Sequence, residues 1–314
     1  MNEVKQWFLS GKGNKAAIII LLIVSYSQMC QSAHPAFVCA DYSQGKVFVI
    51  SGDNKVEWEY PADECNDVWV LPNGNLLFNT GHGVKEVTRA KNIVFSYESE
   101  SGIYACQRLA NGNTFIGECN SGRLLEVDPD GKIVKTVRLL PDSVDGGHSF
   151  MRNARKLDNG NYLVAHYGLD KVCEYDSVGK LVWEIMIKGG PHSVIRRKNG
   201  HTLIACSDHN GEPRVVEVDK AKTIVWQLSE NELPGIKLKF MTGMQCLPNG
   251  NLVLTNWVGH RPSGDNTHAF EITREKKVIW KLDDQPFLKT ISSIQIIDSK
   301  GMPFPTVPSS LLSE

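Results

Sequence analysis

Apolar and polar positions alternate in steps of two along much of this chain. Examples are Leu124-Leu-Glu-Val-Asp128, Val172-Cys-Glu-Tyr-Asp176 and Val215-Val-Glu-Val-Asp219. Successive side chains of a β-strand point to opposite faces, so this alternation predicts short, half-buried strands. After residue 33 no segment sustains the apolar period of a helix. The pattern therefore predicts an all-β protein.

Residues 1–33 have a different pattern. Three lysines precede an apolar run over residues 16–24, and small and polar residues then lead to Ala33. A positive start, a short apolar centre and a small-residue exit are typical of a secretory signal peptide, and the run is too short to span a bilayer comfortably. We expect export to the periplasm or the medium, cleavage near Ser32 or Ala33, and no membrane span in the mature protein. Lipid anchoring at Cys30 is the alternative, although the residues before it form a poor lipobox.

Three short phrases recur in the same order through the rest of the chain. The first is an Asn-Gly-Asn turn, and the Asn-Gly pair is a strong signal for a two-residue hairpin. The second is a glutamate between apolar residues, and the third ends in an aromatic residue. The turns follow Leu71, Leu109, Leu157 and Leu247, with a variant after Arg197; the aromatic residues are Trp58, Phe95, Trp183, Trp226 and Trp280.

Each repeat is predicted to form one four-stranded blade of a β-propeller. Complete repeats begin near Cys65, Ile103, His148, His192 and Met241. The segment 36–60 supplies only the last three strands of a blade, and Ile291–Ile297 supplies only a first strand. Together they predict a sixth blade, in which the C-terminal strand joins the N-terminal blade and leaves no open edge. The expected organisation is a signal peptide over 1–33, a six-bladed propeller over 34–301 and a tail over 302–314.

These phrases resemble the pyrroloquinoline-quinone-type repeat and the bacterial arylsulfotransferase-like propellers over about residues 36–301. The resemblance implies a propeller fold. Quinoprotein dehydrogenases of that superfamily usually have eight blades and a metal-assisted quinone site, and neither is found in this sequence. Arylsulfotransferases use a transiently sulfated histidine, but no histidine here lies in a motif that matches theirs residue by residue. Because the shared phrases describe turns and packing, they indicate the fold more strongly than the function.

Charge and cysteine content narrow the choice of partners. The chain has 34 Lys+Arg and 35 Asp+Glu, so we expect no nucleic-acid binding by bulk electrostatics. Without Cys30, the remaining cysteines show no CxxC pair and no zinc-ligand spacing. They are interpreted mainly as buried single thiols, with disulfides left open. We expect a monomer without a cofactor.

The candidate binding face is the side of the ring where the loops entering each first strand and leaving each second strand gather. It holds most of the histidines. The residues assigned to it are His82, Glu118, His148, His166, Tyr167, His192, Asp208, His209, Asn256, Trp257, His260 and His268. Loops around a water-filled channel are polar in any case. One interpretation is therefore that the polar residues of this face bind no ligand. A divalent metal at the channel mouth is another, because ligands from different blades have no fixed spacing.

Strand alternation also predicts which side chains face the central channel. They are mostly polar: Asp67, Trp69, Gln107, Asn153, Arg155, Gln245 and Gln295. Arg155 is the lone charge in its ring, and Asp67 is its nearest plausible partner. The pair either closes a water-filled channel or holds an anion or a sugar hydroxyl. Trp69 and Trp257 lie outside the repeated tryptophan positions, which suits either loop packing or stacking on a carbohydrate ring.

The sequence thus predicts an exported propeller that binds a small polar or carbohydrate-like ligand, with an acidic ligand as one option, at the histidine-rich face of its channel. The alternative is an enzyme acting on that ligand, either by arylsulfotransferase-like group transfer through a histidine or as a polysaccharide lyase or hydrolase. For catalysis, His148 and His192 are expected to converge above Arg155. One imidazole would act as base or nucleophile, and Arg155 would neutralise a uronate or a developing anion.

Overall fold

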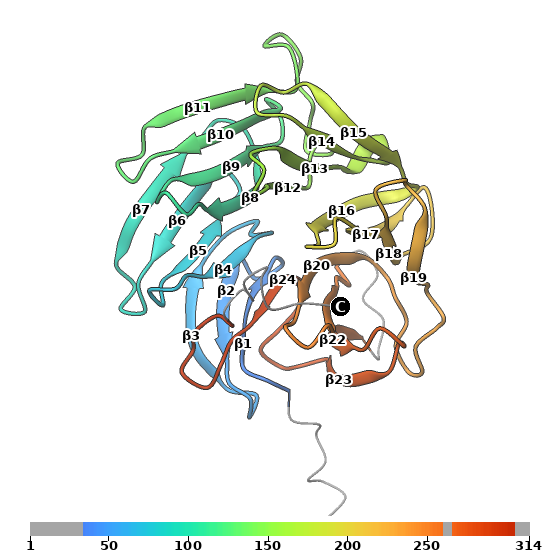
Figure 1. Cartoon of the computed structure of the whole chain (residues 1–314). Coiled ribbons are helices and arrows are strands. Elements are labelled where there is room, and N and C mark those ends of the chain that lie inside the picture. The colour runs from blue at the N-terminus through green and yellow to red at the C-terminus, as the bar shows by residue number, and fades with distance from the viewer. Residues whose placement is uncertain (1–33, 260–265, 305–314) are drawn as a thin grey trace, which may run out of the picture. The chain divides into compact units, whose positions relative to one another are not determined.

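The structure, a computed structural model, describes residues 34–259 and 266–304, and twenty-four strands make up about half of them. They form six antiparallel sheets of four strands, arranged as the blades of a ring (Figure 1). The one helical element in these residues is a 3₁₀ turn, Tyr167–Leu169. None of their helices is long and apolar enough to cross a membrane. The predicted signal peptide, and residues 305–314 of the predicted tail, lie outside the described residues.

Five of the six blades contain four consecutive strands and begin with their inner strand, whereas the first blade takes its inner strand from the C-terminal end. The first blade contains β24 (Ile291–Ile296), β1 (Phe37–Asp41), β2 (Lys46–Ile50) and β3 (Val56–Pro61). The second contains β4 (Val68–Val70), β5 (Leu76–Asn79), β6 (Gly83–Val87) and β7 (Ile93–Glu98), and the third contains β8 (Ile103–Arg108), β9 (Thr114–Glu118), β10 (Arg123–Val127) and β11 (Ile133–Arg138). The fourth contains β12 (Asn153–Lys156), β13 (Tyr162–His166), β14 (Lys171–Tyr175) and β15 (Leu181–Met186). The fifth contains β16 (Gly189–Arg196), β17 (Thr202–His209), β18 (Arg214–Val218) and β19 (Ile224–Leu228), and the sixth contains β20 (Met241–Cys246), β21 (Leu252–Asn256), β22 (Thr267–Ile272) and β23 (Val278–Asp283).

The ring closes between the two ends of the propeller, which confirms the prediction of six blades. β24 is the inner strand of the first blade and pairs antiparallel with β1, with Phe37 opposite Ile296 and Ala40 opposite Ser293. The same strand packs into a hydrophobic cluster with Val253 and Trp280 of the sixth blade. The C-terminal strand therefore joins the blade that the N-terminal segment begins.

The hydrophobic core is divided into six clusters, each between two neighbouring blades. Apolar side chains of one sheet pack onto those of the next sheet, so no blade buries its faces alone. Among the described residues, Cys246 is exposed and all other cysteines are buried free thiols. The expectation of single thiols agrees with this arrangement.

The recurring glutamate links the turn of its own blade to the next blade. The second asparagine of the Asn-Gly-Asn turn donates to it, as between Asn161 Nδ2 and Glu174 Oε1 at 2.7 Å. The other carboxylate oxygen accepts from Arg196 of the following blade at 2.6 Å. That guanidinium also lies 5.2 Å from the ring centre of Trp183, whose Nε1 donates to the carbonyl of Lys220. The repeated phrases are thus blade-to-blade contacts, and they account for the fold rather than for a function.

Candidate functional site

Two cavities lie along the central channel and share part of their lining. The smaller, here called the aromatic chamber, has a volume of about 230 Å³. The larger, the polar chamber, has a volume of about 1360 Å³ and extends to the Asn-Gly-Asn turns of the fourth, fifth and sixth blades. The residues that line both are Asn66, Arg152, His192 and Thr242.

One residue from each blade lines the smaller cavity, and these six residues are here called the entrance ring. Its members line the aromatic chamber and occupy the same position of the repeat, directly before the channel residues that alternation predicted. They are Asn66, Tyr104, Arg152, His192, Thr242 and Ser292. Strict alternation would turn this position between the blades, so alternation alone did not assign these residues to the channel.

β-Bulges explain why four of these side chains reach the chamber. Ile103 and Ala105 face consecutive residues of β9, so Tyr104 is the extra residue on β8. His192 is likewise extra between Pro191 and Ser193. Similar irregularities occur at Thr242 and Ser292. A bulge breaks the alternation of a strand and re-aims a side chain. The signal in the sequence was a polar or aromatic residue at this position in every repeat.

Aromatic rings form the wall of the smaller chamber. Phe240 lies at the centre, with ring centroids 5.3 Å from Trp257, 5.5 Å from His192 and 6.2 Å from Tyr167. Tyr42 meets Trp257 edge-on at 6.1 Å. Together with the hydroxyls and the amide of the entrance ring, these rings offer flat apolar faces beside polar groups, which suits a ring-shaped polar ligand.

Arg152 is the only Lys or Arg among the described residues that line the aromatic chamber. Its guanidinium carbon lies 4.4 Å from the ring centre of Tyr104 and 5.3 Å from that of Tyr167. Within the described part of the chain it forms no ion pair with a carboxylate, and its buried Nε has no hydrogen-bond partner. A half-buried cation that protein carboxylates leave uncompensated is a ready site for an anion.

His192 is the neighbouring titratable group. Its side chain is buried, and burial together with the charge of Arg152 lowers its pKa to about 3. The imidazole is therefore neutral at neutral pH. His148 also lines the aromatic chamber but is exposed. The two histidines do share a cavity, but the arginine that lines it with them is Arg152 rather than the expected Arg155.

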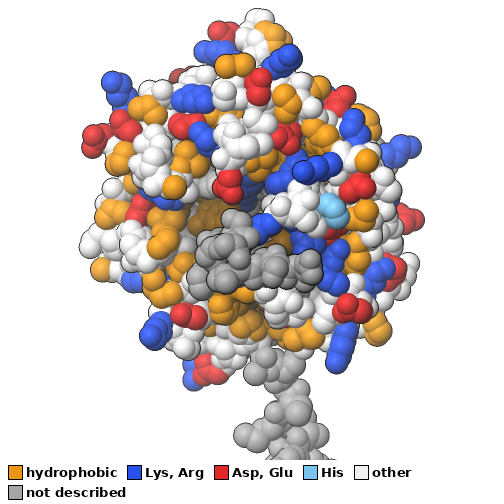
Figure 2. Space-filling view, in the orientation of Figure 1, with side chains coloured by type: hydrophobic (Ala, Val, Ile, Leu, Met, Phe, Trp, Pro, Cys, Tyr) orange, Lys and Arg blue, Asp and Glu red, His pale blue; other side chains and the backbone are white. Residues whose placement is uncertain are grey.

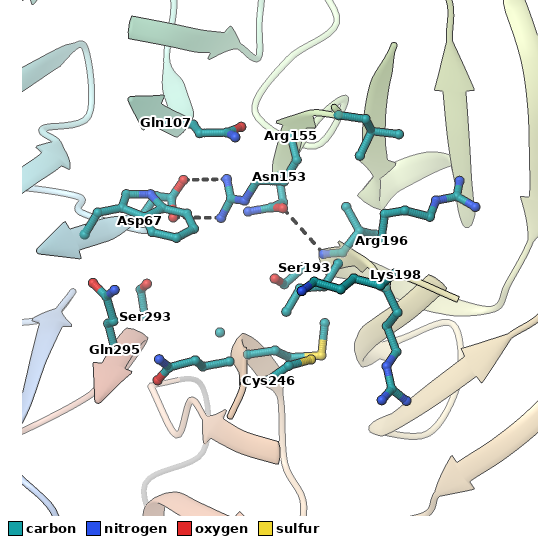
Figure 3. A pocket seen from close by; sticks show the side chains of 18 of the residues that line it. Asp67, Gln107, Asn153, Arg155, Ser193, Arg196, Lys198, Cys246, Ser293 and Gln295 are labelled. Carbon is teal, nitrogen blue, oxygen red and sulfur yellow. Dashed lines mark hydrogen bonds and ion pairs between the residues drawn. The ribbon is translucent and has the colours of Figure 1, made fainter. Parts of the chain in front are cut away.

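Arg155 lies in the polar chamber and is bound by Asp67 (Figure 3). Two hydrogen bonds of 2.7 and 2.9 Å join its guanidinium to both carboxylate oxygens. The same guanidinium lies 4.9 Å from the ring centre of Trp69. Asp67 also accepts from the backbone N–H of Cys106 at 3.0 Å. The Asp67 carboxylate binds both terminal nitrogens of the Arg155 guanidinium. This geometry favours the interpretation in which the pair closes the channel over the one in which Arg155 holds a ligand.

Several residues predicted to bind a ligand have polar atoms that are bound to other parts of the protein. Buried Glu118 accepts from Arg123, Ser99 and Ser121, and its position leaves it outside both chambers. The amide of Asn256 binds backbone groups of the loop before β20. Both nitrogens of buried His166 bind protein oxygens, at Phe150 and Tyr175. Buried His268 binds Asp284 at 2.9 Å.

The remaining predicted residues divide between the chambers and the surface. Tyr167 and Trp257 line the aromatic chamber, and Gln107, Asn153, Gln245 and Gln295 line the polar chamber. His82, Asp208 and His209 line neither, although the His209 ring lies 4.8 Å from that of Tyr167. His260 lies outside the described residues. In residues 34–259 and 266–304, no group of three or more His, Cys, Asp or Glu side chains is placed to hold a metal ion.

The fold is shared with known structures. No protein-family model matches the chain, and no curated protein matches it. A protein of unknown function from Bacteroides caccae is 28% identical, with a TM-score of 0.75 over 83% of this chain and 98% of that chain. Virginiamycin B lyase from Staphylococcus aureus is 15% identical, with a TM-score of 0.53 over 82% and 87%. BBS1N, in complex with ARL6DN, is 16% identical, with a TM-score of 0.51 over 86% and 87%. The last two show a common β-propeller architecture and nothing more.

Proposed function

We propose that this chain is an exported, monomeric propeller of the PQQ-like superfamily that binds a small carbohydrate-like anion in the aromatic chamber. The observation that supports this most is Arg152, a half-buried cation between two tyrosine rings with no carboxylate partner in the described residues. A carboxylate or sulfate on the ligand would take the place of that missing partner. The chamber volume of about 230 Å³ favours a ligand the size of one sugar ring.

The aromatic walls and the hydroxyls supply the rest of the recognition. Trp257 and Tyr167 offer ring faces for the C–H groups of a sugar, while Thr242 and Asn66 offer hydrogen bonds to its hydroxyls. Neutral His192 can donate or accept one further hydrogen bond without adding charge. A uronic acid combines a ring, hydroxyls and one carboxylate, and it fits this set of groups better than a neutral sugar.

Binding is proposed ahead of catalysis because of the His192 pKa of about 3. A base with so low a pKa is available in its neutral form but accepts a proton weakly. The alternative, an enzyme, depends on His192 as well. A nucleophile in sulfuryl transfer or a base in elimination must be a neutral imidazole, which is the form of His192 beside Arg152. Incubation with an aryl sulfate, followed by intact mass, would detect a sulfated histidine. Ultraviolet absorbance would detect the new double bond of an eliminated uronate.

Calorimetric titration with galacturonate, glucuronate, galactose and glucose tests the binding proposal. We expect the two uronates to bind and the two neutral sugars to bind at least about tenfold more weakly, as for loss of one charge-assisted hydrogen bond. Arg152→Gln should remove this difference. Arg138→Gln is the matched control, because Arg138 lies on the outer strand β11 and lines neither chamber. Equal binding of all four sugars to the wild type, or unchanged uronate binding by Arg152→Gln, would refute the proposal.

A further inference from the structure

Three amide side chains in the polar chamber use their oxygen atoms to accept hydrogen bonds from the backbone of the next blade. Gln295 Oε1 accepts from the backbone N–H of Val70 at 2.6 Å, and Gln245 Oε1 accepts from that of Ile296 at 2.7 Å. Asn153 Oδ1 accepts from the N–H of Val194 at 3.4 Å (Figure 3). Each bond joins an inner strand to the inner strand of the next blade.

This arrangement determines the chemistry of the channel wall. A backbone N–H can bond only to an acceptor, so each amide must direct its oxygen to the neighbouring blade. The NH₂ group is then left for the chamber, and none of the three has a hydrogen-bond partner among the described residues. The wall therefore presents donors from the first, fourth and sixth blades.

The chamber is also rich in cations, although the whole chain has a net charge of -1. Its charged lining residues are Arg152, Arg155, Lys156, Arg196, Arg197, Lys198 and Lys220, against Asp67, Asp158 and Glu174. Figure 2 shows Lys and Arg side chains gathered beside the central hollow. In Figure 3 Lys198 extends into the chamber, whereas Arg196, which pairs with Glu174, points away from it. Neither Lys198 nor Lys220 forms an ion pair within the described residues.

The size of the chamber decides between a single ion and a longer ligand. Its volume of about 1360 Å³ is above the roughly 300–1,000 Å³ typical of pockets for drug-sized molecules. It opens among the turns at 157–160, 197–200 and 247–250, at the end of the channel away from the aromatic chamber. A single sulfate would leave most of this space empty, whereas a short chain of linked sugars would fill it.

We propose that the polar chamber is a second binding site, for an acidic oligosaccharide whose carboxylate or sulfate groups accept hydrogen bonds from Asn153, Gln245 and Gln295 and pair with Lys198. This site goes beyond the proposed function, which concerns the aromatic chamber. Oxyanions have acceptors and no donors, and so they match a wall of amide NH₂ groups and ammonium groups. A neutral oligosaccharide lacks the charge that such a wall selects.

The substitutions Gln245→Glu and Gln295→Glu test the donor argument directly. Glutamate keeps an oxygen for the neighbouring backbone N–H but replaces the NH₂ donor with a second, charged acceptor. Lys198→Gln removes the ammonium group from an exposed residue, so folding is not at risk. Titration calorimetry would compare a galacturonate hexamer, a chondroitin sulfate hexasaccharide and neutral maltohexaose. We expect the acidic probes to bind the wild type and each substitution to weaken them by about tenfold or more.

Two controls separate this site from the aromatic chamber and from surface charge. Trp257 lines only the aromatic chamber, so Trp257→Ala should leave hexamer binding within about twofold while it weakens uronate monosaccharides. Lys132→Gln removes an exposed lysine that lines neither chamber and should change nothing. The proposal is overturned if neither acidic hexamer binds, if maltohexaose binds equally well, or if both glutamate variants and Lys198→Gln bind like the wild type.

Discussion

Arg155→Met is expected to destabilise the propeller, because it leaves a buried carboxylate without its ion-pair partner. The Asp67 side chain is 3% exposed and that of Arg155 is 16% exposed. Removing Arg155 takes away both of its bonds to Asp67 and leaves the carboxylate only the N–H of Cys106 among its described partners. Breaking one partner of a buried ion pair typically costs about 3–5 kcal/mol. Because Arg155 borders a large cavity, we expect the lower end of that range, about 3 kcal/mol.

The double variant Asp67→Asn/Arg155→Met separates the ion pair from packing. The new amide oxygen can still accept from the Cys106 N–H, and no unpaired charge remains. The double variant should therefore be more stable than Arg155→Met alone, with a coupling energy of about 2 kcal/mol between the two positions. Urea denaturation followed by tryptophan fluorescence, at neutral pH, measures all four proteins of this cycle.

A loss below about 1 kcal/mol in Arg155→Met would refute the reasoning, because that value is typical of solvent-screened surface pairs. The pair would then be one of the water-exposed contacts of the channel. Arg155 would be available to a ligand, which is the functional one of the two interpretations that the sequence left open.

Two further predictions concern the scaffold. Deletion of residues 290–314 removes β24, the inner strand of the first blade, so we expect insoluble or oligomeric protein. A monomeric product with an unchanged melting temperature would contradict the ring closure. Burial lowers the pKa of His166 to about 4, so between pH 6.5 and 4 the unfolded chain binds a proton that the folded protein does not. The stability that depends on neutral His166 is therefore complete above pH 6.5 and is lost as the pH falls to 4. The loss attributable to His166 is about 3 kcal/mol, and urea denaturation across this range should show a flatter pH dependence in His166→Gln than in the wild type.

The repeat in the sequence was sufficient to predict the fold. Its period fixed four strands per blade, and its incomplete first and last copies fixed closure by the C-terminal strand. These features are local: a turn such as Leu71–Asn75 and an alternating strand each depend on neighbouring residues. Alternation also placed Asp67, Arg155, Gln245 and Gln295 on the channel side, where they line the polar chamber.

The tertiary structure decided which of these positions line a cavity. Tyr104, His192, Thr242 and Ser292 enter the aromatic chamber through bulges, and a bulge is visible only when the partner strand is known. Arg155 is paired with Asp67, which is distant in sequence, whereas Arg152 lines the aromatic chamber and has no carboxylate partner among the described residues. The sequence determines the blades because they are made of short-range repeats. It leaves the site open, because a channel residue acquires its chemistry from neighbours that other blades contribute.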